Sequence, residues 1–505
     1  MLDRRREVLI GISLFAAALM VRLIFAARLV FPPLDDPAFY IQTARNLAAG
    51  RGLMIDVIWN YSVPFASVTH PSHEYWMPLA TFLIAPFLRL WGNSLWAAQL
   101  PGLMCGALLV PITFGLARYL WPDVRDRRWA VLAALLLIAG ALPVYQAAST
   151  DSAAPFALCV SLALIAGGLA IERRSVRWSL LAGVMSGLSY LARSDGLLVP
   201  ALIVTMMIGS IALRQLSWIN VVSLVGATAA IVGAWWLRNL NTFGVPQPAS
   251  PWPMVALQNY GQLFNWQVPP TLSGLLAQGA SIAVDLRWQA LQHNVGVWLI
   301  MSFPYGIYGL PGLFSERRTV IRLGLIYALT LYFVTAIIFS VPTLMGLFYH
   351  SAGATLPWLA IGGALGIKRI WRRWRLLAVA LCLVTIVLIL MQTALAWPSV
   401  IADSRANQTK FAAVTEWLRP NVPLDQPIVT NEAHSLNYAS GYPTLTLPNQ
   451  QDVVTLRQLA DRYGAHYVIV FGSVGLYPEA LNEPAVKARL AATLPDVAVY
   501  ELLPQ

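Results

Sequence analysis

The chain is dominated by long apolar stretches, which constrain its fold more than any other feature. Of its 505 residues, 58% are hydrophobic and only 11% are charged, and the mean hydropathy is +0.62. A helix of about 20 apolar residues is long enough to cross a bilayer, whereas a soluble domain of this size does not reach such a composition. The sequence therefore predicts a polytopic α-helical membrane protein.

Short basic clusters between the apolar stretches predict how the helices are oriented. They lie at residues 4–6, 125–128, 173–177, 214, 317–322 and 368–375. Positive side chains accumulate in cytoplasmic loops, so we place all of these clusters inside the cell. Alternation between them then requires about 11 transmembrane helices, near residues 8–31, 95–121, 129–147, 153–171, 178–192, 196–213, 218–237, 291–313, 320–341, 353–367 and 376–397. The N terminus is then cytoplasmic and the C terminus external.

One apolar stretch, residues 77–91, does not fit this scheme as a span. It is short, it contains Arg89, and counting it would move every later basic cluster to the outside. We therefore expect a juxtamembrane or re-entrant helix inside a large first external loop, residues 32–94. A second large external loop is expected at residues 238–290, whose tryptophans would suit either the membrane interface or the binding of a sugar.

The composition changes after residue 397. Residues 398–505 hold 10 of the 23 acidic residues of the chain. An amphipathic segment at 409–418 precedes an alternation of predicted strands and helices: a strand at 427–430, a helix at 453–463, a strand at 466–471, a helix at 485–492 and a strand at 497–502. The sequence thus predicts a transmembrane domain, residues 1–397, followed by a small soluble extracytoplasmic α/β domain, residues 398–505.

Two adjacent aspartates, Asp35 and Asp36, follow the first apolar stretch directly. Carboxylates at a membrane surface are costly unless they are solvated or functional. Since Pro37 comes next, the pair could also cap a helix. Asp151, which the topology places at another external loop–helix junction, could likewise cap the helix that follows it.

A further external junction contains Arg193 and Asp195 in the run YLARSDGLL. The two side chains could pair with each other, and Arg193 could also extend to the membrane interface. All of these junctions could instead converge on one external cavity. There a carboxylate in lowered dielectric would act as a base toward a hydroxyl, and an arginine would bind a phosphate.

Histidines offer two further candidates. His70, His73 and Glu74 have i, i+3 and i+4 spacing, so a helix would place them on one face, where a metal site is conceivable. We prefer a helix start at residues 69–71, with these side chains lining the cavity. His350, in the run LFYHSAGATLPW, is expected outside, either as a contact of a phosphate or as an interfacial histidine.

The runs DDPAFYIQTARNLAAGRG, HPSHEYWMPL, ASTDSAAPF and LARSDG together resemble the lipid-dependent GT-C glycosyltransferases, which include protein mannosyltransferases, aminoarabinose transferases and bacterial arabinosyltransferases. The resemblance covers roughly residues 1–240 by motif and the whole chain by architecture. It implies inverting transfer of a sugar from a polyprenyl-phosphate donor to an acceptor hydroxyl on the outer face. Asp35 matches the base, with Asp36 as the alternative. Asp151 matches a second carboxylate, and Arg193 the contact of the donor phosphate.

The implied reaction assigns roles to the remaining candidates. The departing phosphate needs charge neutralisation more than protonation, and Arg193, with Arg45 or His350, would supply it. Further side chains are expected to line the substrate cavity, namely Tyr40, His70, His73, Glu74 and Asp195. No cofactor is identified with certainty, and the presence of a divalent metal stays open.

The expected partners are a polyprenyl-phosphate-linked sugar, membrane lipid, and an acceptor that is a lipid, a polysaccharide or a protein. Nucleic-acid binding is not expected, because the positive charge forms topology clusters instead of a basic surface domain. Arginine greatly outnumbers lysine, which favours a prokaryotic source and hence a bacterial plasma membrane. A transporter or flippase of a lipid-linked glycan is the alternative, but such proteins carry charges and broken helices at mid-bilayer. A structural assembly protein would not need the external aspartates and arginine together.

Overall fold

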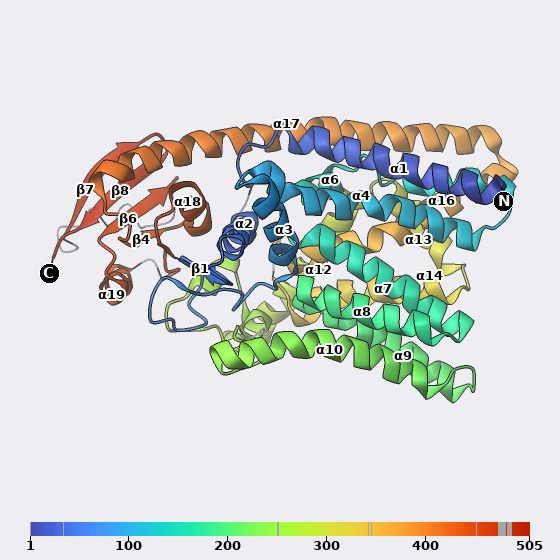
Figure 1. Ribbon diagram of the computed structural model, residues 1–505, viewed down its shortest axis with the longest axis horizontal. Coiled ribbons are helices and arrows are strands. Elements are labelled where there is room, and N and C mark those ends of the chain that lie inside the picture. The colour runs from blue at the N-terminus through green and yellow to red at the C-terminus, as the bar shows by residue number, and fades with distance from the viewer. Residues whose placement is uncertain are drawn as a thin grey trace.

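The structure is a computed structural model that describes residues 2–33, 35–249, 252–341, 343–344, 346–450, 452–472, 481 and 487–504. A bundle of roughly parallel helices forms one end and a mixed sheet the other, and the long helix α17 runs along both (Figure 1). The bundle consists of α1 (Leu2–Ala26), α4 (Leu95–Leu120), α5 (Arg127–Leu135), α6 (Ala141–Ala148), α7 (Ala153–Arg173), α8 (Val176–Ala192), α9 (Leu198–Ala212), α10 (Trp218–Phe243), α12 (Ala280–Ser302), α13 (Tyr305–Phe314), α14 (Thr319–Phe333), α16 (Leu356–Arg373) and α17 (Arg375–Asn421).

The predicted fold class, a polytopic helical membrane protein with a small α/β region at its C-terminal end, is confirmed. Among the described residues, seven helices are long and apolar enough to cross a membrane, and the pair α12 and α13, bent by 102°, would make an eighth. The other predicted spans coincide with shorter or interrupted helices: α5 with α6, α8, and α16.

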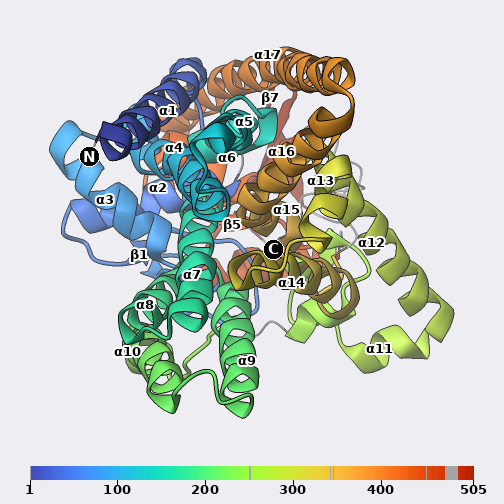
Figure 2. The same cartoon turned by 90° about the vertical axis from the view of Figure 1, so that its right-hand side faces the viewer.

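Helix α7 is the most enclosed of these spans, with 78% of its most apolar window buried. Its alanines and glycines let neighbouring backbones approach closely, as is common for helix contacts inside a membrane. Looking along the bundle, Figure 2 shows α9 and α10 on one side and α17 on the opposite side, with α7 and α16 between them. The first residues of α7 are therefore held firmly, and they lie beside the candidate site described below.

The predicted span at 129–147 is two helices, and a buried arginine bonds to the break between them. Arg22 of α1 donates from Nη1 to the carbonyl of Ile138 at 3.3 Å and from Nη2 to the carbonyl of Leu137 at 3.5 Å. These carbonyls lie in the break between α5 and α6, where helical partners are missing. The Arg22 guanidinium thus occupies the interior of the bundle by bonding to backbone groups that the break leaves open.

Ion pairs bring several predicted cytoplasmic clusters to one end of the bundle. Asp3 pairs with Arg127, and Lys368 Nζ lies 2.7 Å from Asp126 Oδ2. Glu7 and Arg118 pair nearby at 2.8 Å. The N terminus lies at this end, away from the sheet (Figure 1).

The stretch at 77–91 forms the short helix α3 (Leu79–Trp91). At 1.5 Å per residue, its 13 residues extend about 20 Å, less than the roughly 30 Å of a bilayer core. It lies with α2 (Asp35–Ala48) between the bundle and the sheet (Figure 1). The expectation of a helix that does not span the membrane therefore fits the geometry of α3.

The sheet has the strand order β2-β5-β4-β6-β8-β7. Its strands are β2 (Val57–Ile58), β4 (Ile428–Thr430), β5 (Thr444–Thr446), β6 (Tyr467–Phe471), β7 (Ala488–Leu494) and β8 (Val497–Leu502), and the helices α18 (Ala433–Ser440) and α19 (Val453–Tyr463) accompany them. The first four strands in this order are parallel, while β8 and β7 pair antiparallel. A separate two-stranded ribbon joins β1 (Met54–Ile55) to β3 (His70–Pro71).

One predicted helix in this region is wrong. Residues 488–492, expected to be helical, belong to strand β7, and residues 485 and 486 of that prediction lie outside the described part of the chain. The run ARLAATL contains good helix formers, but pairing with β8 along its length overrides this local preference. The predicted strands at 427–430, 466–471 and 497–502 and the helix at 453–463 are confirmed.

Strand β2 comes from the first external loop and forms one edge of the C-terminal sheet. Val57 is in register with Thr444, and the Thr444 N–H donates to the Asp56 carbonyl at 3.1 Å. Ile58 is buried in one apolar cluster with Val429 and Leu445. The expected domain boundary at residue 397 lies within α17, so the two regions share both a continuous helix and a sheet.

Candidate active site

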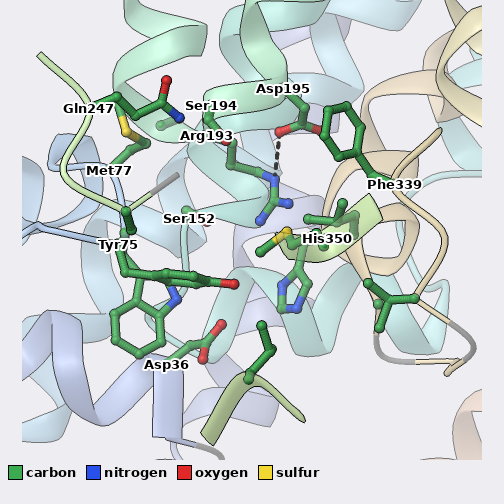
Figure 3. Close-up of a pocket in the computed structure, with 18 of the residues that line it drawn as sticks. Asp36, Tyr75, Met77, Ser152, Arg193, Ser194, Asp195, Gln247, Phe339 and His350 are labelled. Atoms are coloured by element: carbon green, nitrogen blue, oxygen red, sulfur yellow. Dashed lines mark hydrogen bonds and ion pairs between the residues drawn. The ribbon is translucent and has the colours of Figure 1, made fainter. Parts of the chain in front are cut away.

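A cavity of about 290 Å³ lies where α2, the C-terminal end of α8 and the short helix α15 (Leu347–Ser351) meet (Figure 3). Among the predicted site residues, it is lined by Asp36, Tyr40, Arg193, Asp195 and His350. These positions come from three segments that lie far apart in the sequence. The predicted convergence of external junctions on one cavity thus occurs for these side chains.

Asp36, Asp151 and His350 form a compact cluster at the base of this cavity. Their ligand atoms all lie within 4.8 Å of one another. His350 Nδ1 lies 2.7 Å from Asp151 Oδ2, and the Asp151 carboxylate also accepts from the Ser152 hydroxyl at 3.1 Å. In Figure 3, the Asp36 carboxylate is directed toward the cavity from the side opposite Arg193.

Arg193 is held in place by its Nε. This atom donates to Asp195 Oδ1 at 3.1 Å and to the Ser351 hydroxyl at 2.9 Å, and the same hydroxyl bonds to the other Asp195 oxygen. The guanidinium is directed into the cavity toward His350 (Figure 3). The predicted pairing of Arg193 with Asp195 is therefore present, and it orients the cation instead of removing it from the cavity.

The environment shifts the pKa values of the three carboxyls differently. Burial raises the pKa of Asp36 to about 6, with Asp151 adding to the rise and His350 and Arg193 opposing it. Burial also raises the pKa of Asp35 to about 8, and the nearby Glu432 adds to this. For Asp151 the effect of burial is outweighed by His350, so its pKa lies below the usual range. Asp151 is thus the carboxyl that stays ionised most readily.

Asp35 is directed away from the cavity, toward the C-terminal region. Its Oδ1 accepts from the backbone N–H of Ser435 at 3.3 Å and from the Ser435 hydroxyl at 3.1 Å. Arg45 is also absent from the described cavity lining. Its guanidinium lies over the ring of Tyr438, 4.4 Å from the centroid, and bonds to Gln42 at 2.8 Å.

The residues 69–74 do not form the expected helix. His70 belongs to strand β3, and His73 has a positive φ of 67° in the turn that follows. His70 Nε2 lies 3.6 Å from Glu74 Oε1, and His73 Nδ1 lies 3.2 Å from the Trp76 carbonyl. All three side chains are buried behind the cavity, because pairing of β3 with β1 extends the backbone where a helix was predicted.

Aromatic residues that we did not predict line much of the cavity. They include Trp59, Tyr75, Trp76, Tyr190 and Tyr260. The Trp76 side chain hydrogen-bonds to Asp36, and its ring packs against Trp59 with centroids 4.4 Å apart. Tyr75 and Trp76 directly follow the candidate residue Glu74 in the run HEYWMPL. This position beside a predicted site residue is the sequence signal that could have identified them.

The cluster of Asp36, Asp151 and His350 is also where a divalent cation would fit in the described part of the chain. Two carboxylates and an imidazole are common ligands for such ions. The metal hypothesis thus concerns this cluster, since the His70, His73 and Glu74 set does not bring its ligand atoms together in this way.

A second cavity, of about 320 Å³, lies beside α15. Tyr349 lines it, whereas the next residue, His350, lines the first cavity. Its other walls come from α6, α12 and α17 and are mainly apolar, and Asp403 lies among them. Among the described residues of this lining, none is basic.

Comparisons with known proteins relate the chain to enzymes that handle lipid-linked sugars. Residues 69–236 match the family of dolichyl-phosphate-mannose-protein mannosyltransferases. A comparison with curated protein sequences found no match. The crystal structure of ArnT from Cupriavidus metallidurans bound to undecaprenyl phosphate superposes with a TM-score of 0.62 at 15% identity, covering 98% of this chain and 99% of ArnT.

A second solved structure agrees. Archaeal oligosaccharyltransferase AglB from Archaeoglobus fulgidus, in complex with an inhibitory peptide and a dolichol-phosphate, superposes with a TM-score of 0.54 at 12% identity over 93% of this chain and 70% of AglB. The chain has a GT-C glycosyltransferase fold. The GT-C resemblance expected from the sequence motifs is thereby confirmed. Helix α2, which contributes Asp36 and Tyr40 to the cavity, lies at the end of the bundle that faces the sheet (Figure 1).

Proposed function

We propose that this chain is an inverting glycosyltransferase that transfers a sugar from a polyprenyl-phosphate donor to an acceptor hydroxyl on the outer face of a bacterial plasma membrane. The N terminus would lie in the cytoplasm and residues 398–505 outside. The observation that carries the proposal is that Asp36 and Arg193 line the same cavity from opposite sides. The lipid phosphates bound in the ArnT and AglB structures support a donor of this chemistry.

Asp36 would be the base. The acceptor oxygen attacks the anomeric carbon while Asp36 takes the hydroxyl proton, the bond from this carbon to the phosphate oxygen breaks, and polyprenyl phosphate leaves. A single displacement of this kind inverts the anomeric configuration. The resemblance matched Asp35 to this role, but the geometry favours Asp36, because Asp35 is bonded to Ser435 outside the cavity.

Arg193 would neutralise the departing phosphate. The bonds from its Nε to Asp195 and Ser351 hold the side chain in place, so little reorganisation is needed when charge develops on the leaving group. A guanidinium can also bind two phosphate oxygens at once. The cavity residues Tyr40 and His350 lie close enough to this centre to contact the sugar or the phosphate.

The second cavity would hold the acceptor, which we propose to be a lipid, a polysaccharide or a protein. Inversion requires the acceptor to approach from the side opposite the leaving group, and the adjacent α15 residues His350 and Tyr349 line the first and the second cavity respectively. A mainly apolar lining with Asp403 and no described basic residue suits an apolar carrier with a neutral or cationic polar group.

Transfer assays test the proposal. Purified protein in vesicles would be given a panel of radiolabelled polyprenyl-phosphate sugars, and transfer to membrane lipids, polysaccharide and peptides would be followed. We expect transfer by the wild type and its loss in Asp36→Asn, with donor binding retained. Binding and movement of the lipid-linked sugar across the bilayer without transfer, equal in both proteins, would identify a flippase instead.

A further inference from the structure

The helix α2 presents two different faces. Asp36 and Tyr40, four residues apart, face the cavity, whereas Asp35, Gln42 and Arg45 contact α18 of the C-terminal region. Side chains three, four or seven positions apart share one face of a helix. The rotation of α2 about its axis therefore decides which of the two adjacent aspartates enters the cavity.

The contact at Asp35 has the geometry of a helix cap supplied by another segment. Glu432 precedes α18 but makes no capping bond with its side chain. Ser435, in the first turn of α18, instead donates its backbone N–H and its hydroxyl to Asp35 Oδ1. Backbone N–H groups in a first turn have no partner within the helix, and an acidic side chain stabilises them.

Further bonds fix the same two helices along their length. Gln42 Nε2 donates to Asn437 Oδ1 at 2.7 Å and to the Asn437 carbonyl at 3.3 Å. The Arg45 guanidinium packs on the Tyr438 ring at 4.4 Å. Contacts at positions 35, 42 and 45 lie on one stripe of α2, so α18 resists rotation of α2 over three turns.

We infer that the C-terminal region is a working part of the active site, in which Ser435 positions Asp35 and thereby orients Asp36 toward the cavity. This inference rests on the proposed role of Asp36 as the base. Asp35 and Ser435 are positioning residues, since neither lines the described cavity. Residues 400 positions apart in the chain are thus bonded directly beside the proposed base Asp36.

The environment of Asp35 is consistent with a positioning role. Its Oδ1 is occupied by the two bonds from Ser435, and the side chain does not line the described cavity. An asparagine has nearly the same shape as an aspartate and keeps the oxygen that Ser435 contacts. If Asp35 is a positioning residue, Asp35→Asn and Asp35→Ala should differ in transfer activity. If Asp35 were the base, both variants would lose activity.

The experiment compares these variants in the transfer assay. We expect Asp35→Asn to retain activity within about threefold, and Asp35→Ala to lower kcat by about 10- to 100-fold with little change in KM for the donor, since the cavity lining is intact. Ser435→Ala should lower kcat by roughly fivefold, and Ser435→Thr, which keeps the hydroxyl, should restore it. Ser440→Ala is the matched control, because this serine of α18 bonds to the Leu436 carbonyl of the same helix.

The outcomes separate this inference from the proposed function. Full activity in Asp35→Ala and Ser435→Ala, with none in Asp36→Asn, would overturn the positioning role and leave the base assignment intact. Equal loss in Asp35→Asn and Asp35→Ala, with an active Asp36→Asn, would make Asp35 the base and overturn both. If Asp35→Ala fails to fold, Asp35→Asn and the two Ser435 variants still decide the question, because a positioning role requires the threonine variant to exceed the alanine variant in kcat.

Discussion

His350 Nδ1 lies 2.7 Å from Asp151 Oδ2, and this bond links α15 to the loop before α7. Because the pKa of Asp151 is lowered, its carboxylate is ionised and can only accept, so His350 donates the Nδ1 proton. The imidazole orientation at the cavity is therefore set by a carboxylate that the enclosed helix α7 holds in place. Asp151 thus orients His350, which lines the cavity, although Asp151 itself does not line it.

Substitution of Asp151 tests this orientation. Asp151→Asn keeps the size of the side chain but removes the charge and permits the other imidazole tautomer, so we expect kcat to fall by about 10- to 100-fold. Substitution of Asp285, an exposed external carboxylate that bonds to Gln289 of its own helix, is the control and should leave transfer unchanged. Wild-type kcat in Asp151→Asn would show that the bond is only structural.

The pH profile of transfer tests the assignment of Asp36. Because the pKa of Asp36 is raised to about 6 and the base must be ionised, kcat/KM should rise with pH through about 6 and level off above it. The Arg193 guanidinium lowers this pKa, so a variant that removes its charge should shift the acid limb upward. An acid limb near 4, the ordinary range of an aspartate, would contradict a buried base.

Chelation tests the metal hypothesis. We expect transfer to persist in the presence of EDTA, because the Arg193 guanidinium, directed into the cavity, would neutralise the departing phosphate, and His350 and Asp151 are already bonded to each other. Activity would be measured with and without chelator and after adding Mn²⁺ or Mg²⁺, with Mn²⁺ binding followed by electron paramagnetic resonance. Loss on chelation, recovery with Mn²⁺ and loss of the Mn²⁺ signal in Asp151→Asn would place a cation among Asp36, Asp151 and His350.

Arg22 should contribute to stability far from the cavity. Arg22→Met fills a similar space but leaves the carbonyls of Leu137 and Ile138 without their donor, so we expect a loss of about 1–3 kcal/mol. Thermal unfolding in detergent would measure it. Met20→Ala, at an exposed position of the same helix, is the matched control and should change the midpoint little. An unchanged midpoint in Arg22→Met would mean that water replaces the guanidinium in the break.

Several elements follow from local sequence. The membrane class, most spans and the strands at 427–430, 466–471 and 497–502 could be predicted, because hydropathy and side-chain alternation act over short windows. Strand β7 could not, since its alanine-rich run becomes a strand only by pairing with β8. The bonds from Arg22 to carbonyls in the break between α5 and α6 likewise could not be predicted, since they come from another helix.

The sequence by itself determined that Asp35, Asp36, Asp151, Arg193 and His350 stand near the ends of apolar segments of a membrane protein, because the apolar runs that precede or follow them can be read directly from the chain. Only the tertiary structure decided which of these side chains share a cavity. Adjacent residues on a helix differ by about 100° in direction. Whether Asp35 or Asp36 faces the cavity therefore depends on the packing of α2 against α18, a contact between segments about 400 residues apart that no local pattern records.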